Sequence, residues 1–387
     1  MVPKLRFKEF CGEWDLKLLK DITEKIGDGL HGTPKYDENG EYFFINGNNI
    51  RNGKIIVLEE NKKVGEDEFI KNDKGLDLDT VLMSINGTIG NLAYYNNEKV
   101  FLGKSVAYIK VSDEIKKQYL FQVLQTNSIQ KYYTLSLTGT TIKNLGLEAI
   151  RNTKIKLPSL PEQTKIADFL STVDDKIQNQ QDKITHLENI KKGFMQKIFS
   201  RKIRFKDDSG EDFPEWEEKK IKDVFKITRG YVLSANNVEK NINKEYIYPV
   251  YSSQTKDKGL LGYYNEYLYE DAITWTTDGA NAGTVHFRRG KFYCTNVCGV
   301  LISENGYANK CIAEMINRIS KKYVSYVGNP KLMNNIMAEI KIDLPCLKEQ
   351  QKISDILSLL DEKIDTDKET LEHLKQLKKG LLQQMFA

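Results

Sequence analysis

Residues 155–199 read IKLPSLPEQTKIADFLSTVDDKIQNQQDKITHLENIKKGFMQKIF, and residues 342–386 read IDLPCLKEQQKISDILSLLDEKIDTDKETLEHLKQLKKGLLQQMF. The two segments align without a gap at an offset of 187 residues, and 21 of the 45 aligned positions are identical. Agreement of this extent indicates an internal repeat and not a chance similarity. We therefore expect a fold in which one structural unit is used twice.

A second pair of matching stretches precedes the two copies. RFKEF (6–10) and EWDLKLLKDI (13–22) resemble RFKDD (204–208) and EWEEKKIKDV (215–224), and Trp14 matches Trp216 at an offset of 202 residues. We call the matching stretches 6–22 and 204–224 the markers, and the chain between a marker and the following helix a block. Because the offsets differ by 15 residues (202 − 187), the second block is shorter than the first by that length. The two blocks hardly match each other. A duplicated scaffold with dissimilar blocks predicts two equivalent positions that hold two different specificities.

The repeated segments have the pattern of long amphipathic helices. Their apolar residues recur mostly at spacings of three, four and seven, as on one helical face. Ser159, Pro161 and Glu162 suit a capping box with a first-turn proline, which Lys348 weakens in the second copy. A helix of about 39 residues spans roughly 58 Å. It cannot bury its stripe alone, so we expect the two to pair as an antiparallel coiled coil.

The helix length also suggests a spacing role. Since B-DNA rises about 3.4 Å per base pair, each helix has the length of roughly 15 to 17 base pairs. Gly193 and Gly380 occupy equivalent positions, where a glycine lowers helix stability, and they predict a close helix approach or a break. His186 and His373 also match and are expected on the helix surface.

Each block between marker and helix reads as a mixed α/β domain of short strands separated by turns. The predicted strands are 42–50, 53–60, 80–85, 91–96 and 105–111, then 246–253, 261–269, 271–277, 283–289 and 291–296. One short helix is expected in each block, at 118–127 and at 311–320. The predicted fold class is α+β, with two mixed α/β domains separated by two long helices in an antiparallel coiled coil and a pseudo-two-fold internal repeat. Its boundaries are 1–157 for the first marker and domain, 158–200 for the central helix, 201–344 for the second marker and domain, and 345–387 for the C-terminal helix.

Five clusters within the blocks are predicted to be loops that face DNA: 29–36, 46–54, 138–144, 252–256 and 329–335. Asn, Gln, Arg and Lys side chains read base edges, while Lys, Ser and Thr hold phosphates. The alternative is that Asn and Gly only form turns and Tyr only packs in sheets. The candidate DNA-binding residues are His31, Thr33, Lys35, Asn46, Asn48, Arg51, Lys54, Thr140, Thr141, Lys143, Ser252, Ser253, Gln254, Lys256, Asn281, Arg288, Arg289, Asn329 and Lys331.

Composition and missing motifs limit the other classes of function. The net charge of +4 and the pI near 8.5 permit a nucleic-acid partner without requiring one. No apolar run approaches the ~20 residues of a membrane span, and the N-terminus lacks a signal-peptide core. Five cysteines without a CxxC motif fit a reducing compartment, so we expect a cytoplasmic protein with no membrane partner. Four scattered histidines, and a Glu98 where a P-loop needs glycine, leave no metal site, bound cofactor or catalytic constellation in view.

Two helix motifs and four phrases of the blocks together point to a family. The motifs are LPSLPEQTKIADFLSTVDDKI (157–177) and LPCLKEQQKISDILSLLDEKI (344–364), each followed by a KKG segment. The phrases are FFINGNNIRNGKI (43–55), SINGTIGNLAYY (84–95), PVYSSQTKDKGLLGYY (249–264) and TTDGANAGTVHFRRGKFY (276–293). Over nearly its whole length, the chain resembles the specificity subunit of type I restriction–modification systems.

The resemblance implies a function that spacing and composition do not give. Each block would be a target recognition domain for one half of a bipartite double-stranded DNA site, with the helices setting the unspecified spacer. The subunit would be non-catalytic and would dock two methyltransferase subunits, which bind S-adenosylmethionine and methylate adenine. Two restriction subunits, ATP- and Mg-dependent translocases that cut DNA, would join them. Because the blocks differ, the target should be asymmetric.

Two other classes of function stay open from the residues alone. An autonomous DNA-binding regulator or orphan scaffold would bind specific DNA tightly without partners. An enzyme with its own site would methylate or cut DNA unaided.

Overall fold

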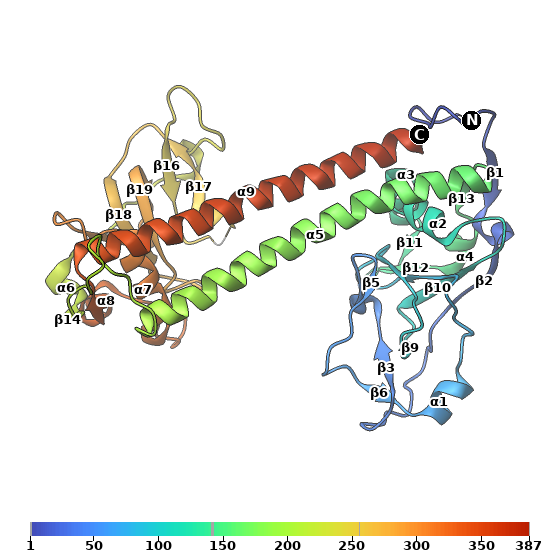
Figure 1. The fold of residues 1–387 in the computed structure, drawn as a ribbon, viewed down its shortest axis with the longest axis horizontal. Helices are drawn as coiled ribbons and strands as arrows, with labels where there is room; N and C mark the ends of the chain where they lie inside the picture. The colour runs from blue at the N-terminus through green and yellow to red at the C-terminus, as the bar shows by residue number, and fades with distance from the viewer. Residues whose placement is uncertain (1, 141–142, 255, 387) are drawn as a thin grey trace. The chain divides into compact units, whose positions relative to one another are not determined.

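The computed structural model describes residues 2–140, 143–254 and 256–386 (Figure 1). The chain divides into two units, of which unit 1 comprises Met1–Asp182 and Glu369–Ala387 and unit 2 comprises Lys183–Lys368. Both long helices cross the division, so each unit contains one block and a part of each helix. The four segments proposed from the repeat, with boundaries at 157, 200 and 344, follow a different criterion and stay a prediction.

Unit 1 is built around a four-stranded antiparallel sheet in the order β2-β10-β7-β8. Beside it lie a three-stranded sheet, β6-β3-β9, and three two-stranded pairs. The main sheet packs with α2 and α3 into one apolar core, in which Tyr119 and Tyr133 are fully buried. The elements are β1 (Asp15–Leu18), β2 (Thr23–Asp28), β3 (Tyr42–Ile45), β4 (Ile50–Arg51), β5 (Lys54–Ile55), β6 (Lys63–Val64), α1 (Glu66–Lys71), β7 (Thr80–Ser84), β8 (Leu92–Tyr94), β9 (Val100–Leu102), β10 (Val106–Val111), α2 (Lys117–Leu124), α3 (Asn127–Leu135), β11 (Leu137–Thr138), β12 (Asn144–Leu145), α4 (Leu147–Arg151), β13 (Lys154–Leu157) and the 3-10 helices Leu19–Ile22 and Gly47–Asn49.

Unit 2 is built around a six-stranded sheet in the order β15-β20-β18-β19-β16-β17, in which only β16 and β19 pair in parallel. Helix α7 packs on this sheet, and Trp275 is the largest fully buried side chain of the core between them. The elements are β14 (Glu217–Lys220), α6 (Ile221–Val224), β15 (Lys226–Arg229), β16 (Tyr248–Tyr251), β17 (Leu260–Tyr264), β18 (Tyr269–Thr276), β19 (Val285–Cys294), β20 (Cys298–Ile302), α7 (Lys310–Ser320), α8 (Asn334–Glu339), β21 (Lys341–Leu344) and the 3-10 helices Ala235–Asn237, Lys256–Gly259 and Lys321–Tyr323.

One short strand pair opens and closes each block and shows the repeat in its register. Asp15 pairs with Leu157 in β1–β13, and Glu217 pairs with Leu344 in β14–β21. The differences, 217 − 15 = 202 and 344 − 157 = 187, are the two offsets found in the sequence. The internal repeat is therefore confirmed at the level of individual paired residues.

A buried carboxylate at the start of each long helix ties the N-terminal marker to that helix. Arg6 donates from Nε and Nη2 to Glu162, both at 2.7 Å, and Arg204 donates in the same way to Glu349 at 3.3 and 3.1 Å. Trp216 Nε1 donates to the same Glu349 carboxylate at 2.8 Å. Such two-point contacts hold both groups in a fixed geometry. The capping-box interpretation of Glu162 needs correction, because its carboxylate holds Arg6.

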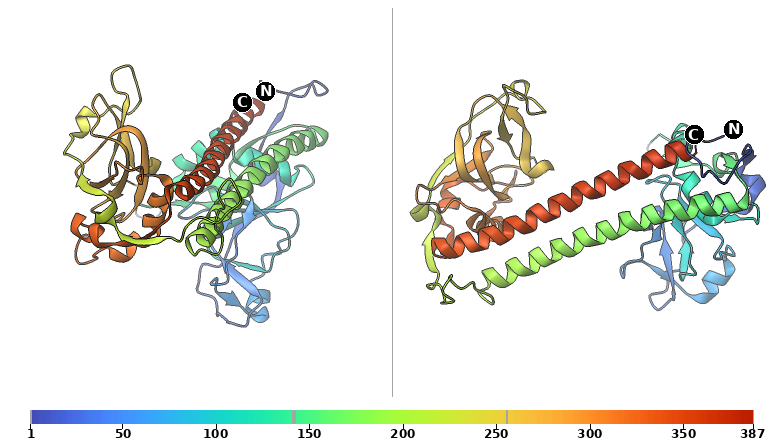
Figure 2. Two further views of the ribbon diagram at one scale, coloured as in Figure 1. Left: turned by 60° about the vertical axis from the view of Figure 1, so that its left-hand side comes forward. Right: turned by 45° about the horizontal axis from the view of Figure 1, so that its top comes forward.

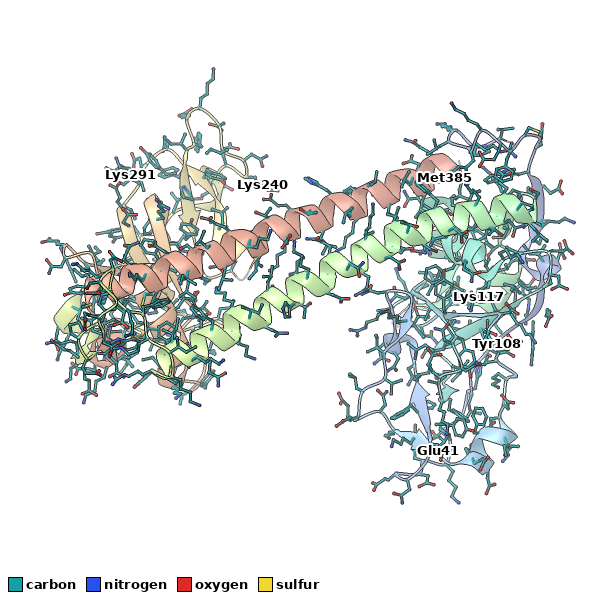
Figure 3. All side chains as sticks on the ribbon, viewed as in Figure 1. Glu41, Tyr108, Lys117, Lys240, Lys291 and Met385 are labelled. Carbon is teal, nitrogen blue, oxygen red and sulfur yellow. The ribbon has the colours of Figure 1, made fainter. Side chains whose placement is uncertain are left out.

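The two long helices are α5 (Leu160–Phe199) and α9 (Leu347–Met385), which run side by side in opposite directions within each unit (Figure 2). In unit 1, Ile166 and Leu170 share a core with Leu382 and Met385, and Met385 is labelled in Figure 3. In unit 2, the equivalent end of α5 packs against the first turns of α9. The ends of each stripe are thus buried by the partner helix together with the core of a block, while Ile190 and Leu377 stay exposed.

The prediction for the helix glycines was wrong. Both helices continue through Gly193 and Gly380, and a Cβ at either position would meet no described atom within 4 Å. Neither glycine marks a break or a close approach within the chain. His186 and His373 are exposed on the helix surface, as expected.

Two equivalent ion pairs cross between the paired helices. Asp174 binds Lys378 at 2.6 Å in unit 1, and Asp361 binds Lys191 at 2.6 Å in unit 2. Since 174 + 187 = 361 and 191 + 187 = 378, each pair is the image of the other under the repeat. Asp361 also accepts from Lys310; although burial alone would raise the pKa of Asp361, these lysines hold it below its ordinary value. Both aspartates therefore join the two helices.

Sequence and structure differ at one strand of unit 2. The sequence predicts two strands, 283–289 and 291–296, separated by Gly290, whereas β19 runs unbroken from Val285 to Cys294. A bulge absorbs the glycine, since Glu270 pairs with Lys291 and Ala272 with Arg288. The Gly290 amide donates to Asp271 Oδ1 at 2.7 Å and stabilises this bulge.

The predicted fold class is confirmed: two mixed α/β blocks, two long antiparallel helices and an internal pseudo-two-fold repeat. Over the described ranges, none of the helices has the length and apolar character that crossing a membrane requires.

The buried carboxylate that receives Arg204 gives a stability prediction. Glu349→Ala removes the hydrogen-bond acceptor of Arg204 and Trp216, and we expect a loss of about 3–5 kcal/mol in the free energy of unfolding. The control Glu362→Ala changes an exposed residue of the same helix and should stay within about 0.5 kcal/mol of the wild type. Urea unfolding of both variants tests this; equal effects would show that the buried contact is not important.

Candidate nucleic-acid interface

In each unit, strand ends bring the predicted clusters to one edge of the main sheet. Strands β2 and β7 both pair antiparallel with β10, so they run in the same direction and end at the same edge. In unit 2, β15 and β18 have this relation to β20. The loop that begins at residue 29 therefore lies beside the loop that follows Ser84. In the same way, the loop after Arg229 lies beside the loop after Thr276.

Hydrogen bonds connect these loops in unit 1. The Leu30 amide donates to the Leu102 carbonyl oxygen at 2.8 Å, and the Gly47 amide donates to Ser105 Oγ at 2.8 Å. Thr88 Oγ1 donates to the Gly47 carbonyl oxygen at 3.3 Å. The backbones of Asn86 and Asn144 form an isolated antiparallel β-bridge. Clusters 29–36 and 46–54 and the described residues 138–140 and 143–144 are thus parts of one surface.

Unit 2 repeats this arrangement with other side chains. Thr295 Oγ1 bonds to Ser252 Oγ at 3.0 Å, and Asn281 Nδ2 donates to the Ser253 carbonyl oxygen at 3.2 Å. The Leu332 amide donates to the Thr277 carbonyl oxygen at 2.9 Å, as the Leu145 amide does to Ile85 in unit 1. Leu145 and Leu332 are related by the repeat offset of 187 (332 − 145). Both surfaces therefore have one backbone plan.

A glycine at the end of the first strand permits this plan in both units. A Cβ on Gly29 would lie 2.2 Å from the Leu102 carbonyl oxygen, and a Cβ on Gly230 would lie 2.1 Å from the Cys294 carbonyl oxygen. Such distances are far below van der Waals contact, so only glycine allows the two backbones to approach. The equivalence of Gly29 and Gly230 was not evident from sequence alignment.

Most of the candidate residues are exposed. Exposed are His31, Thr33, Lys35, Asn48, Arg51, Lys54, Thr140, Lys143, Gln254, Arg289, Asn329 and Lys331, while Asn46, Ser252, Ser253 and Asn281 are half-buried. His31 Nε2 contacts Asp28 Oδ2 at 2.7 Å. Lys331 lies 3.7 Å from Asp278. Thr141 and the side chain of Lys256 lie outside the described residues.

Three candidates do not join the shared surfaces in the same way. Lys54 follows the Asn52-Gly53 turn of the β4–β5 hairpin and lines a groove of about 600 Å³ beside α5. Arg289 lies on β19 at the bulge opposite Asp271, beyond the loops. Arg288 is buried at 7% exposure, so it does not present its whole side chain to a ligand.

The candidate set missed residues that the structure places within these surfaces. Asn86, Thr88 and Ser105 lie among the loops of unit 1, and Asp278 and Thr295 lie among those of unit 2. The phrases SINGTIG and TTDGANAG contain some of them, but no residue type there distinguishes a binding side chain from a turn. Only the pairing of the strands shows which loop ends meet.

The surfaces are suited to polar recognition. They carry amide, hydroxyl and ammonium groups on exposed loops, which is the set of side chains that contacts base edges and phosphates. In the described part of the chain, no group of three or more His, Cys, Asp and Glu residues is arranged to hold a metal ion.

Comparisons with known proteins agree with this architecture. The family model for the type I restriction modification DNA specificity domain matches residues 12–189 and 214–376. A Mycoplasma pneumoniae protein assigned as the N-terminus of a type I specificity subunit is 40% identical over 141 residues, which is 36% of this chain and 74% of that protein. A Methanocaldococcus jannaschii protein assigned as the MjaX specificity subunit of a type I restriction enzyme is 26% identical over 98% of this chain and 94% of its own length.

A solved structure gives the same fold. The S subunit of a type I restriction–modification system from M. genitalium aligns with a TM-score of 0.67 over 100% of this chain and 99% of its own, at 20% identity. Two other M. pneumoniae relatives are matched over 45% and 39% of their own length, and two more over 78% and 81%.

The close backbone approach at Gly29 predicts a sharp difference between two glycines of one loop. Gly29→Ala should lower the free energy of unfolding by about 1–3 kcal/mol, because its Cβ clashes with a backbone carbonyl. Gly32→Ala is the matched control, since a Cβ there would meet nothing within 4 Å. Thermal and urea unfolding of both variants measure this; a neutral Gly29→Ala would contradict the close approach.

Proposed function

This chain belongs to the type I restriction–modification specificity subunits, and from that premise we propose that each unit binds one half of a bipartite, asymmetric DNA site. The observation that carries the proposal is the pair of equivalent loop surfaces with unequal side chains. Asn46 of unit 1 follows β3 where Ser252 of unit 2 follows β16, and both accept a hydrogen bond from the neighbouring loop. Equivalent backbone with different polar groups is what two half-sites of different sequence require.

The helices have two proposed roles, as a spacer and as the docking site for methyltransferase subunits. His186, Ile190 and Gly193 share one face of α5, and His373, Leu377 and Gly380 share the equivalent face of α9. Ile190 and Leu377 are 44% and 54% exposed, although both belong to the apolar pattern. The glycines leave open space in which another backbone could approach. Two equal faces suit two copies of one partner.

The chemistry of the complex is proposed to reside in the partner subunits. This chain would supply sequence recognition and no catalytic residue. S-adenosylmethionine would bind to the two methyltransferase subunits, and ATP and Mg²⁺ to two restriction subunits. The methylated base would be adenine, and the same recognition would direct restriction.

Exchange of one block tests the division into half-sites. Replacing residues 217–341 with the block of another family member should change one half of the methylated motif and leave the other half and the gap unchanged. Methylated bases are mapped genome-wide by single-molecule sequencing, with the wild-type chain as reference. A change in both halves would contradict independent recognition by the two units.

Basic residues of unit 1 should contribute to DNA binding through phosphates. Lys35→Ala, Arg51→Ala and Lys143→Ala remove exposed charges, and each lost phosphate contact should reduce the salt slope of log K by about 0.9. Lys240→Ala, a loop lysine of unit 2 outside the clusters, is the control. Binding of the complex is measured between 50 and 200 mM salt, a range of about fourfold. Wild-type affinity and slope in all three variants would exclude this choice of loops.

The two proposed docking faces predict how many methyltransferase subunits each variant binds. Ile190→Asp and Leu377→Asp should each remove one of two methyltransferase subunits, because a carboxylate would enter an apolar contact. Leu359→Asp is the control, since Leu359 is 64% exposed on α9 and its counterpart on α5 is Thr172. Native mass spectrometry of each purified complex reads the stoichiometry. A full complement of partners on both variants would place docking elsewhere.

A further inference from the structure

Arg288 in unit 2 is a buried cation without an acidic partner. Its side chain donates from Nε to Thr274 Oγ1 at 3.0 Å and from Nη2 to the Lys258 carbonyl oxygen at 2.8 Å. Its guanidinium carbon lies 3.7 Å from the centre of the Tyr251 ring. Within the described ranges of the chain, no carboxylate lies within 4.0 Å of the guanidinium. All of these partners are neutral, so the charge is not compensated.

Burial makes this arrangement costly for the folded chain. Arg288 is 7% exposed, and burial lowers its pKa below the ordinary arginine value. A buried charge is normally paired, because isolated charges are strongly disfavoured outside water. The expected partner of Arg288 is therefore an anion from outside the chain.

Arg288 lines a cavity of about 230 Å³ that has room for such an anion. Ser252, Gln254, Thr276, Asn281 and Thr284 also line it, and the described lining includes no Asp or Glu. Lys258 lines the cavity too, but its Nζ binds Asp365 at 2.9 Å. Arg288 is thus the cation of the lining that has no ion-pair partner.

Three other titratable groups near Arg288, which are His286, Asp257 and Glu314, do not form an ion pair with it. His286 also lines the cavity, and burial, followed by the charge of Arg288, lowers the pKa of His286 to about 4, so it is neutral at pH 7. A second cavity of about 250 Å³ shares Arg288 and contains Asp257 and Glu314. Glu314 is held by Lys191 at 3.4 Å, and neither carboxylate lies within ion-pair distance of Arg288.

We propose that the cavity beside Arg288 is a binding site for a phosphate group. Guanidinium, hydroxyl and amide groups are the donors that proteins use for phosphate oxygens. Ser252, Gln254 and Asn281 belong to the loops assigned to DNA, so one source of the group is a backbone phosphodiester. The other source is free inorganic phosphate. The assignment to DNA rests on the proposed function, whereas the anion site does not.

Titration calorimetry of the full chain with inorganic phosphate, at constant ionic strength, tests the site. The wild type and Lys291→Gln, which removes an exposed charge from the same strand, should bind one equivalent. Arg288→Gln should weaken binding at least tenfold. Because unfolding of the unit in Arg288→Gln would also abolish binding, a second measurement uses wild-type crystals soaked in tungstate. Anomalous density within hydrogen-bond distance of Arg288 is expected, and its absence would overturn the proposal.

Competition with DNA then identifies the source of the phosphate. If phosphate, compared with chloride of equal ionic strength, weakens DNA binding by the wild type more than by Arg288→Gln, the group comes from DNA. If DNA binds equally well to the phosphate-saturated chain, the site holds the free anion. If tungstate binds beside Arg288 but the chain does not bind DNA, the anion site is confirmed and the proposed function is wrong.

Discussion

Burial of one apolar stripe along each of two long helices is the constraint on which the rest of the structure depends. A helix of 40 residues with one apolar face is not stable alone in water, and most of its stabilisation comes from packing that face. Pairing α5 with α9 buries part of both stripes, and the Asp174–Lys378 and Asp361–Lys191 contacts fix one antiparallel register. Each block is joined to a helix of this pair both where the block begins and where it ends.

The attachment is also duplicated, so the scaffold is repeated in both halves while the loop surfaces differ between them. In each half a buried glutamate at the start of the helix holds an arginine of the marker, and a short strand pair closes the block. Between these fixed points the loops differ in length and side chains while their strand order at the sheet edge is kept. Sequence can therefore change in the loops at little cost to the scaffold.

The fold could be predicted from the sequence where the pattern was long or repeated. The two helices, the antiparallel pairing and the repeat offsets came from 45-residue segments in which many positions agree. Short elements were less accessible: the sequence predicts one helix at 118–127, whereas α2 ends at Leu124 and α3 starts anew at Asn127. Thr126 Oγ1, between them, donates to the Val123 carbonyl oxygen, a local contact that the apolar period does not predict. The candidate surfaces were predicted as clusters, but Arg288 was not separable from Arg289 by sequence, because strand alternation at a bulge decides which of the two is buried.

The central claim is that one chain with two different blocks specifies one asymmetric, bipartite DNA target. The most direct measurement is to co-express the wild-type chain with its cognate methyltransferase subunit and to map methylated adenines genome-wide by single-molecule sequencing. The account predicts one motif in which two unlike half-sites are separated by a gap of fixed length. A contiguous or palindromic motif, or sequence-specific binding by the chain with no methyltransferase complex formed, would contradict it.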